Sequence, residues 1–165
     1  MSNDGFQLDL SASGAPDPIA HHELYRGVAI KRVIAYLIDL VCIGFFLMLA
    51  GFVLFIISVL TLGLLHPLLL MVYALIPFCY HTLLLGGPSH ATLGMRLMGI
   101  EMKSLTIGSP DYVQAAVQTV LFYLSIAIFS PILIWALFDP RRRMLHDILA
   151  GTYVVNRNAA AAIAP

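Results

Sequence analysis

Charge is what this sequence has least of. Only 11% of its 165 residues are Asp, Glu, Lys or Arg, whereas a water-soluble domain has about 25%. Because most residues of a small soluble fold touch solvent, so little charge excludes a water-soluble globular domain. Hydrophobic residues make up 60% of the chain. The sequence therefore predicts a protein whose main solvent is lipid.

The sequence also lacks an excess of either charge, a cysteine framework and any common catalytic motif. Nine Lys and Arg residues balance nine Asp and Glu residues, so no basic field predicts a nucleic-acid partner. Cys42 and Cys79 lie in apolar runs and indicate neither a disulfide framework nor a metal site. The six histidines show no tight ligand spacing. We expect no metal, no cofactor and no enzymatic activity.

The charged residues leave two long gaps in the chain. No Asp, Glu, Lys or Arg occurs between Asp39 and Arg96, and none occurs between Asp111 and Asp139. About 20 apolar residues cross a bilayer as a helix. The first gap is therefore long enough for two spanning helices with a turn, and the second is long enough for one.

Local signals place the two helices of the first gap. We expect them at about residues 33–57 and 68–85, joined by a turn at 58–67. Pro67 suits the first turn of a helix, where its missing N–H is not needed. Gly86-Gly87-Pro88 is a strong signal for the end of the second helix.

Basic residues indicate the orientation of the chain. Arg26, Lys31 and Arg32 precede the first helix, whereas the predicted turn at 58–67 carries no charge. Basic residues beside spanning helices tend to stay in the cytoplasm. We therefore expect a cytoplasmic N-terminus and a cytoplasmic loop after the second helix.

The third apolar stretch, Tyr112–Phe138, leaves two alternatives open. A single crossing would place Arg141, Arg142 and Arg143 outside, against the same charge rule. Two crossings would need about 40 residues, which the stretch does not supply. A re-entrant or strongly bent segment would keep the arginines inside, where we expect them to contact lipid phosphates.

Asp39 is the one acidic residue firmly inside an apolar helix. Arg32 lies seven residues earlier, about 20° short of two turns and roughly 10.5 Å away along the axis, on the same face. That distance is too long for a direct pair within one helix. We expect Arg32 to extend back to the lipid headgroups. We expect Asp39 to meet Arg96, another cation, or Asp147.

An acid inside a membrane helix supports two interpretations. It can be a proton- or cation-linked site, which would make this a transport-related protein that works as an oligomer. Alternatively, the Arg and Asp residues form a structural ion-pair network in a non-transporting accessory, assembly or lipid-binding protein. Membrane lipid and a second copy or a larger membrane protein are the expected partners.

Further polar residues lie near the ends of the apolar segments. Gln114 and Gln118 could line a polar groove or hydrogen-bond between helices. A short amphipathic helix is predicted from Asp139-Pro140 to about Ala150, lying in the membrane interface. Asp147 falls on the flank of its apolar side, which predicts an exposed or paired surface acid. The loop at 86–111 could contain a short hairpin or a strand.

Three segments together carry a family resemblance. They are YRGVAIKRVIAYLID at 25–39, TLGMRLMGI at 92–100 and FDPRRRMLHDILAGTYVV at 138–155. In this order they resemble the RDD family of small bacterial membrane proteins, which is named for one arginine and two aspartates. The resemblance implies an integral membrane protein that is often suggested to take part in transport.

Matched by position, the resemblance assigns the family's arginine to Arg32 and its two aspartates to Asp39 and Asp147. One departure is visible at Gly94-Met95-Arg96, where the family usually has Gly-Lys-Arg. The loop therefore has one cation fewer for any anion or lipid that it might bind.

The sequence thus predicts an all-α membrane protein with two long transmembrane helices, a third spanning or re-entrant apolar segment, and a short interfacial amphipathic helix. Residues 25–155 would form an RDD-like membrane domain. Residues 1–24 and 156–165 would be disordered tails. We expect a multi-pass protein of the bacterial cytoplasmic (inner) membrane.

Overall fold

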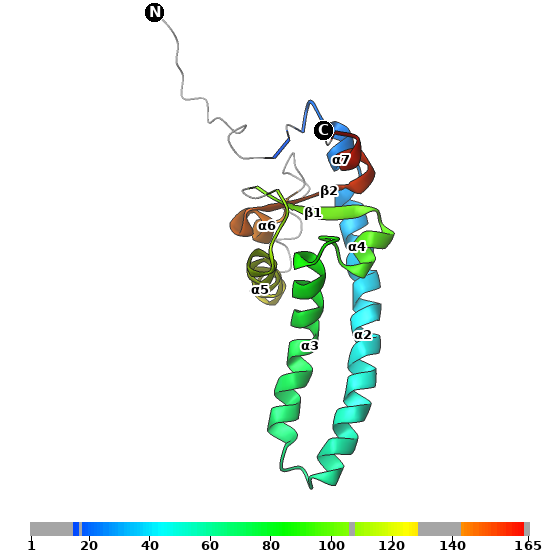
Figure 1. Ribbon diagram of the computed structural model, residues 1–165, viewed down its shortest axis with the longest axis vertical. Coiled ribbons are helices and arrows are strands. Elements are labelled where there is room, and N and C mark those ends of the chain that lie inside the picture. The colour runs from blue at the N-terminus through cyan, green and yellow to red at the C-terminus, as the bar shows by residue number, and fades with distance from the viewer. Residues whose placement is uncertain (1–14, 17, 106–107, 129–142, 164–165) are drawn as a thin grey trace, which may run out of the picture.

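The structure, a computed structural model, describes residues 15–16, 18–105, 108–128 and 143–163. Figure 1 shows a long helical hairpin and, at one end of it, a smaller body that we call the cap. The helices and strands run in the order α1 (His22–Tyr25), α2 (Val28–Leu60), α3 (His66–Gly86), α4 (Leu93–Leu97), β1 (Ile100–Ser104), α5 (Tyr112–Ile128), α6 (Leu145–Ala150), β2 (Thr152–Asn156) and α7 (Arg157–Ile163). The cap consists of α1, α4, β1, α5, α6, β2 and α7, together with the first turns of α2.

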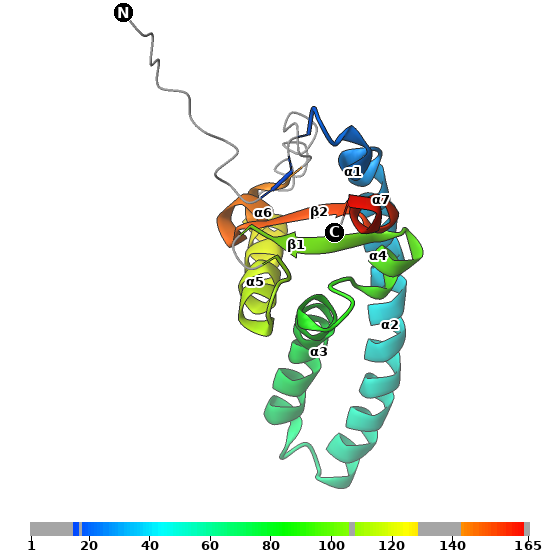
Figure 2. The same cartoon turned by 45° about the horizontal axis from the view of Figure 1, so that its top comes forward.

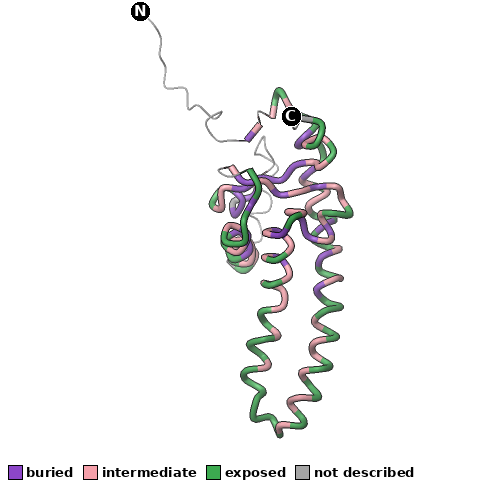
Figure 3. Tube along the Cα trace, viewed as in Figure 1, coloured by how far each residue is buried: buried purple, intermediate pink, exposed green. Residues whose placement is uncertain are grey.

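The hairpin consists of α2 and α3, and both helices are long and apolar enough to cross a membrane. Many residues of both helices are exposed along most of the hairpin, as the green stretches of Figure 3 show. Phe52 on α2 is 65% exposed and Leu70 on α3 is 55% exposed. The prediction of two long apolar helices is confirmed, and Pro67 lies in the first turn of α3 as expected.

α2 begins at Val28, about five residues earlier than the sequence predicts. Val28 is fully buried and belongs to a core cluster that also contains residues of α3, both strands and α5. The first turns of α2 therefore extend beyond the lipid-facing part of the helix and form part of the cap. An apolar-run criterion misses them because Lys31 and Arg32 interrupt the run.

α5 does not run alongside the hairpin. Figure 1 shows α5 nearly end-on, while α2 and α3 extend along the length of the view. α5 packs against α3 and α6, and its buried residues include Ala115, Gln118 and Thr119. The third apolar stretch predicted from the sequence thus begins as a helix that crosses the hairpin axis. Its remainder, residues 129–138, lies outside the described residues.

The cap is organised around a two-stranded antiparallel sheet. β1 pairs with β2 from Ile100 opposite Asn156 to Ser104 opposite Thr152. A strand, one of the two alternatives for the loop at 86–111, is therefore present, and it pairs with residues 152–156. The fold is mostly helical but not all-α as predicted, because this pairing joins two segments far apart in the sequence. α4 precedes β1, and Thr92 is its N-cap residue, whose side-chain oxygen accepts a hydrogen bond from the Met95 N–H.

The two ends of the described chain lie together in the cap (Figure 2). The Asn156 side-chain amide donates to the backbone oxygens of Glu23, Leu24 and Arg26, and its oxygen accepts from the Lys31 ammonium at 2.5 Å. α7 occupies residues for which the sequence predicts a disordered tail. The prediction failed because the local composition of this segment does not show its position in the fold. α7 directly follows β2 and packs against α1.

α6 is shorter than the predicted amphipathic helix. It begins at Leu145, and Gly151 ends it with a positive φ of 65°, as the sequence predicts for a C-cap glycine. The expected N-cap at Asp139-Pro140 lies outside the described residues. α6 packs against α5 and β2, so at least part of its surface is covered by protein.

Candidate functional site

Arg32, near the start of α2, and Asp147, in α6, form a bidentate ion pair. The guanidinium nitrogens donate to the two carboxylate oxygens at 2.5 Å and 2.9 Å. The Arg32 side chain is 11% exposed and that of Asp147 is fully buried. The pair therefore links the hairpin to the cap through a contact from which solvent is almost excluded.

Two further donors complete the hydrogen bonds of Asp147. The Gln118 amide on α5 donates to one oxygen at 2.6 Å, and the Met144 N–H donates to the other at 2.9 Å. The bond to Met144 is local, because Asp147 is in the first turn of α6, where a carboxylate can accept from the residue that precedes the helix. Thr152 on β2 then donates to the Gln118 oxygen at 3.1 Å. The network thus connects α2, α5, α6 and β2.

Burial and the neighbouring charges determine the protonation of Asp147 and His146 in this network. Burial alone would raise the pKa of Asp147, but the neighbouring Arg32 guanidinium and the hydrogen bonds to the carboxylate hold it below its usual range. Burial, together with the positive charge of Arg32, lowers the pKa of His146 to about 4. Asp147 is therefore charged and His146 is neutral at pH 7.

Asp39 lies in a second cluster of hydrogen bonds, about two helical turns after Arg32 along α2. One carboxylate oxygen accepts from the Tyr80 hydroxyl at 2.6 Å and from the Gly94 N–H at 2.8 Å. The other oxygen accepts from the Thr92 hydroxyl at 2.5 Å. Asp39 is only 3% exposed. It therefore fastens α3 and α4 to α2, by one hydrogen bond from Tyr80 of α3 and two from the start of α4.

Close packing at Gly94 makes this arrangement possible. A Cβ atom built on Gly94 would lie 2.8 Å from the carbonyl carbon of Ala35, and closer still to the carbonyl oxygen. Only a residue without a side chain lets the backbone of α4 approach α2 so closely. That approach places the Gly94 N–H within hydrogen-bond distance of Asp39.

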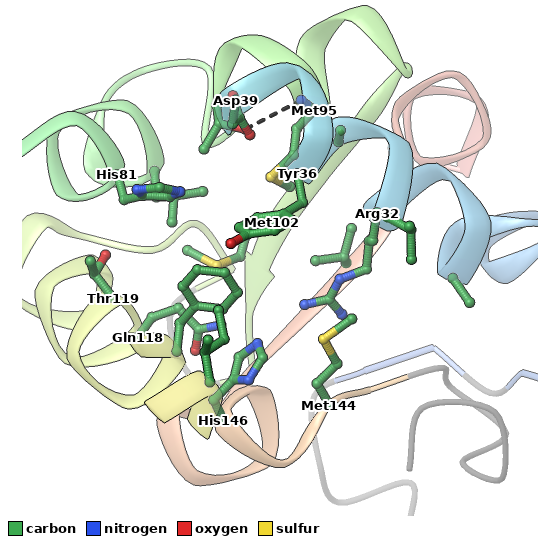
Figure 4. A pocket seen from close by; sticks show the side chains of 18 of the residues that line it. Arg32, Tyr36, Asp39, His81, Met95, Met102, Gln118, Thr119, Met144 and His146 are labelled. Carbon is green, nitrogen blue, oxygen red and sulfur yellow. Dashed lines mark hydrogen bonds between the residues drawn. The ribbon is translucent and has the colours of Figure 1, made fainter. Parts of the chain in front are cut away.

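A cavity of about 370 Å³ lies between the two clusters. Figure 4 shows Arg32, Asp39, Met102 and His146 around it. Its lining comes from α2, α3, α4, β1, α5, α6 and β2, and most of these side chains are apolar. The cavity is thus located where the hairpin joins the cap.

Two sequence-based expectations about contacts were wrong. Arg32 does not extend back to the headgroups, because the buried carboxylate of Asp147 binds it. Asp39 does not meet Arg96 or Asp147, since its donors are two hydroxyls and a backbone N–H. The exposed Arg96 donates instead to the backbone oxygen of Ala91 at 3.1 Å.

The two glutamines hydrogen-bond between segments, which was one of the two alternatives. Gln114 donates to the backbone oxygens of Ala150 and Gly151 at 2.9 Å and 3.2 Å. Gln118 binds Asp147 and also lines the cavity. Both side chains therefore dock α5 on α6 and the residue that follows it.

The basic run before α6 is described only in part. Arg143 is half-buried, whereas Arg141 and Arg142 lie outside the described residues. The lipid-phosphate contacts expected for these three arginines therefore stay a prediction.

Comparison with known proteins shows the family of this chain. A family model for the RDD family matches residues 26–151. The chain belongs to the RDD family. Searches of curated proteins and of solved structures each gave no match. Together with the long apolar α2 and α3, the family membership identifies a membrane protein.

Arg32, Asp39 and Asp147, to which the resemblance assigns the family's arginine and aspartates, make contacts in two separate clusters. Arg32 pairs with Asp147, while Asp39 binds separate donors about two helical turns further along α2. Sequence reasoning missed Tyr80, Thr92 and the Gly94 backbone as partners of Asp39. The only sequence signals for them were a Thr preceding a helix and a glycine two residues later.

Proposed function

We propose that this RDD protein is a multi-pass protein of the bacterial cytoplasmic membrane, with α2 and α3 as spanning helices and its cap in the cytoplasm. Arg26, Lys31 and Arg32 lie at the cap end of the hairpin, whereas residues 61–65 at the opposite end carry no charge. This distribution follows the tendency of basic residues to stay in the cytoplasm.

The pairing of β1 with β2 bears on the third apolar stretch. A single crossing between residues 112 and 138 would separate the two strands by the thickness of a bilayer, about 30 Å. Their backbone pairing instead favours a segment that returns to the side it left. The contacts of Asn156 with Glu23, Leu24 and Arg26 favour the same arrangement.

Reporter fusions test this topology. Green fluorescent protein fused after Pro165 is expected to fluoresce in cells, and alkaline phosphatase fused at the same place is expected to be inactive. Fusions within the turn after Leu60 should give the opposite pair of results. Active phosphatase at the C-terminus would contradict the proposed topology and would favour a single membrane crossing by residues 112–138.

We further propose that the protein is a non-transporting accessory protein, in which Arg32, Asp39 and Asp147 are structural. The observation that carries this proposal is that both oxygens of each buried carboxylate accept hydrogen bonds from the protein itself. A carboxylate bonded in this way has little capacity left for a transported cation. The competing hypothesis is a proton- or cation-linked site at Asp39.

A flux measurement distinguishes these hypotheses. Proteoliposomes that contain the full chain should show proton, sodium and potassium fluxes no greater than protein-free liposomes. Asp39→Asn is expected to lower the melting temperature because the hydroxyl and N–H donors lose a charged acceptor, while leaving the flux at background. A flux through the wild type that Asp39→Asn abolishes would establish the transport hypothesis instead.

A further inference from the structure

The cavity between the hairpin and the cap opens on the outer surface of α2. Ile30 and Val33 line it and are 69% and 56% exposed. On its inner side it reaches Met102 and Val154 of the sheet, which are only 2% and 3% exposed. A ligand that enters between Ile30 and Val33 would therefore reach residues that are otherwise covered by protein.

Most of the polar side chains that line the cavity already have hydrogen-bond partners. Arg32, Asp39 and Gln118 make the ion pair and hydrogen bonds described above, and the Thr119 hydroxyl donates to a backbone oxygen of its own helix at 2.8 Å. Within the described residues, Nδ1 of His146 makes no hydrogen bond, but that atom is itself covered. An ion or a polar solute loses its hydration on entry and needs replacement contacts. The lining therefore favours an apolar ligand.

The size and place of the cavity narrow the class of apolar ligand. A water molecule occupies about 30 Å³ in the liquid, and we take a methylene group to be of similar size. A cavity of about 370 Å³ therefore holds roughly a dozen methylene groups. Val33 is one residue from Arg32 and six from Asp39, so the mouth lies near the end of the apolar part of α2. Lipid chains surround a spanning helix at that depth.

We propose that this cavity binds an acyl chain of a phospholipid from the leaflet on the side of the cap. The chain enters between Ile30 and Val33 and packs against Met102, Phe122 and Ile126. The proposal goes beyond the accessory role and does not depend on it, because it concerns lipid binding and would hold equally for a transporter.

Photo-crosslinking with lipid tests the proposal directly. The full-length protein is reconstituted in vesicles of phosphatidylethanolamine and phosphatidylglycerol that contain a phosphatidylcholine with a diazirine in one acyl chain. After irradiation, mass spectrometry identifies the modified residues. We expect lipid adducts on Met102 and Met144, which line the cavity and are 2% and 7% exposed. Adducts confined to outward-facing residues of the hairpin would overturn the proposal.

A matched pair of variants controls for general lipid contact. Val33→Trp places a bulky side chain at the mouth, and displacing even two methylene groups weakens binding about tenfold. We expect adducts on Met102 to fall by about that factor. Val41→Trp makes the same change at a position of α2 that is 74% exposed and lies outside the cavity lining, and it should leave these adducts unchanged.

The two variants also separate lipid loss from misfolding. Each variant is compared with the wild type by size-exclusion chromatography and by its melting temperature. If Val33→Trp is folded and still gives wild-type adducts on Met102, the lipid reaches the sheet by another route and the proposal fails. If Val33→Trp does not fold, the mapping of adducts on the wild type decides the question alone.

Discussion

Asp147→Asn is expected to lower the free energy of unfolding by about 3–5 kcal/mol, the usual cost of removing one partner from a buried ion pair. The Arg32 side chain, 11% exposed, would keep its charge without a counter-charge. The amide also cannot accept from Arg32, Gln118 and Met144 on both of its polar atoms, because one of them is a donor. Chemical denaturation of the purified protein in detergent micelles measures the loss.

Glu23→Gln is the matched control for Asp147→Asn. It makes the same kind of change at a side chain that is 67% exposed and 3.8 Å from Arg26, where an ion pair contributes less than about 1 kcal/mol. The double variant with Arg32→Met should lose less than the sum of the single losses, since the two residues act as a pair. Equal effects of Asp147→Asn and Glu23→Gln would contradict a structural role for the pair.

Gly94→Ala is expected to cost about 3 kcal/mol, although it adds only a methyl group. The new Cβ would lie 2.8 Å from the carbonyl carbon of Ala35, and backbone atoms have little freedom to move aside. α4 would have to shift away from α2, which adds the loss of the Gly94 hydrogen bond to Asp39 to the cost of overpacking. The same denaturation measurement reports the effect.

Gly44→Ala provides the comparison for this glycine. Gly44 lies in the middle of α2, where a Cβ atom would meet nothing within 4 Å. Ala is favoured over Gly in a helix by about 0.5–1 kcal/mol, so this variant should be neutral or slightly stabilising. If Gly94→Ala were as stable as Gly44→Ala, the close approach of α4 to α2 would not be needed to place the Gly94 N–H.

The hairpin could be predicted from sequence because its signal is local. Two apolar runs, in which Asp39 is the one charged residue, separated by a turn at residues 58–67, predict two long helices. Pro67 and the Gly86-Gly87-Pro88 stop predict where the second helix begins and ends. The need of Asp39 for partners could be predicted as well, since it is an acid within such a run. The identity of these partners could not, because Thr92 lies 53 residues away and the N–H of Gly94 leaves no mark in a sequence.

Asp147 shows why a helix analysed alone can mislead. On an isolated helix it lies at the edge of the apolar side, which predicts some exposure, but α5 and β2 pack against α6 and bury it completely. β2 itself was missed, although a run of Thr, Tyr and two Val residues directly after Gly151 is typical of a strand. Its long-range partner β1 could not be identified from that run.

The separation of 115 residues between Arg32 and Asp147 has a consequence for how the protein is made. At about 5–20 residues per second of synthesis, Arg32 leaves the ribosome roughly 6–23 s before the acid that binds it. Both helices of the hairpin are synthesised in that interval, together with β1. While both helices are being made, the Arg32 guanidinium therefore has no Asp147 to bind, and the cap can close around it only after Asp147 has emerged.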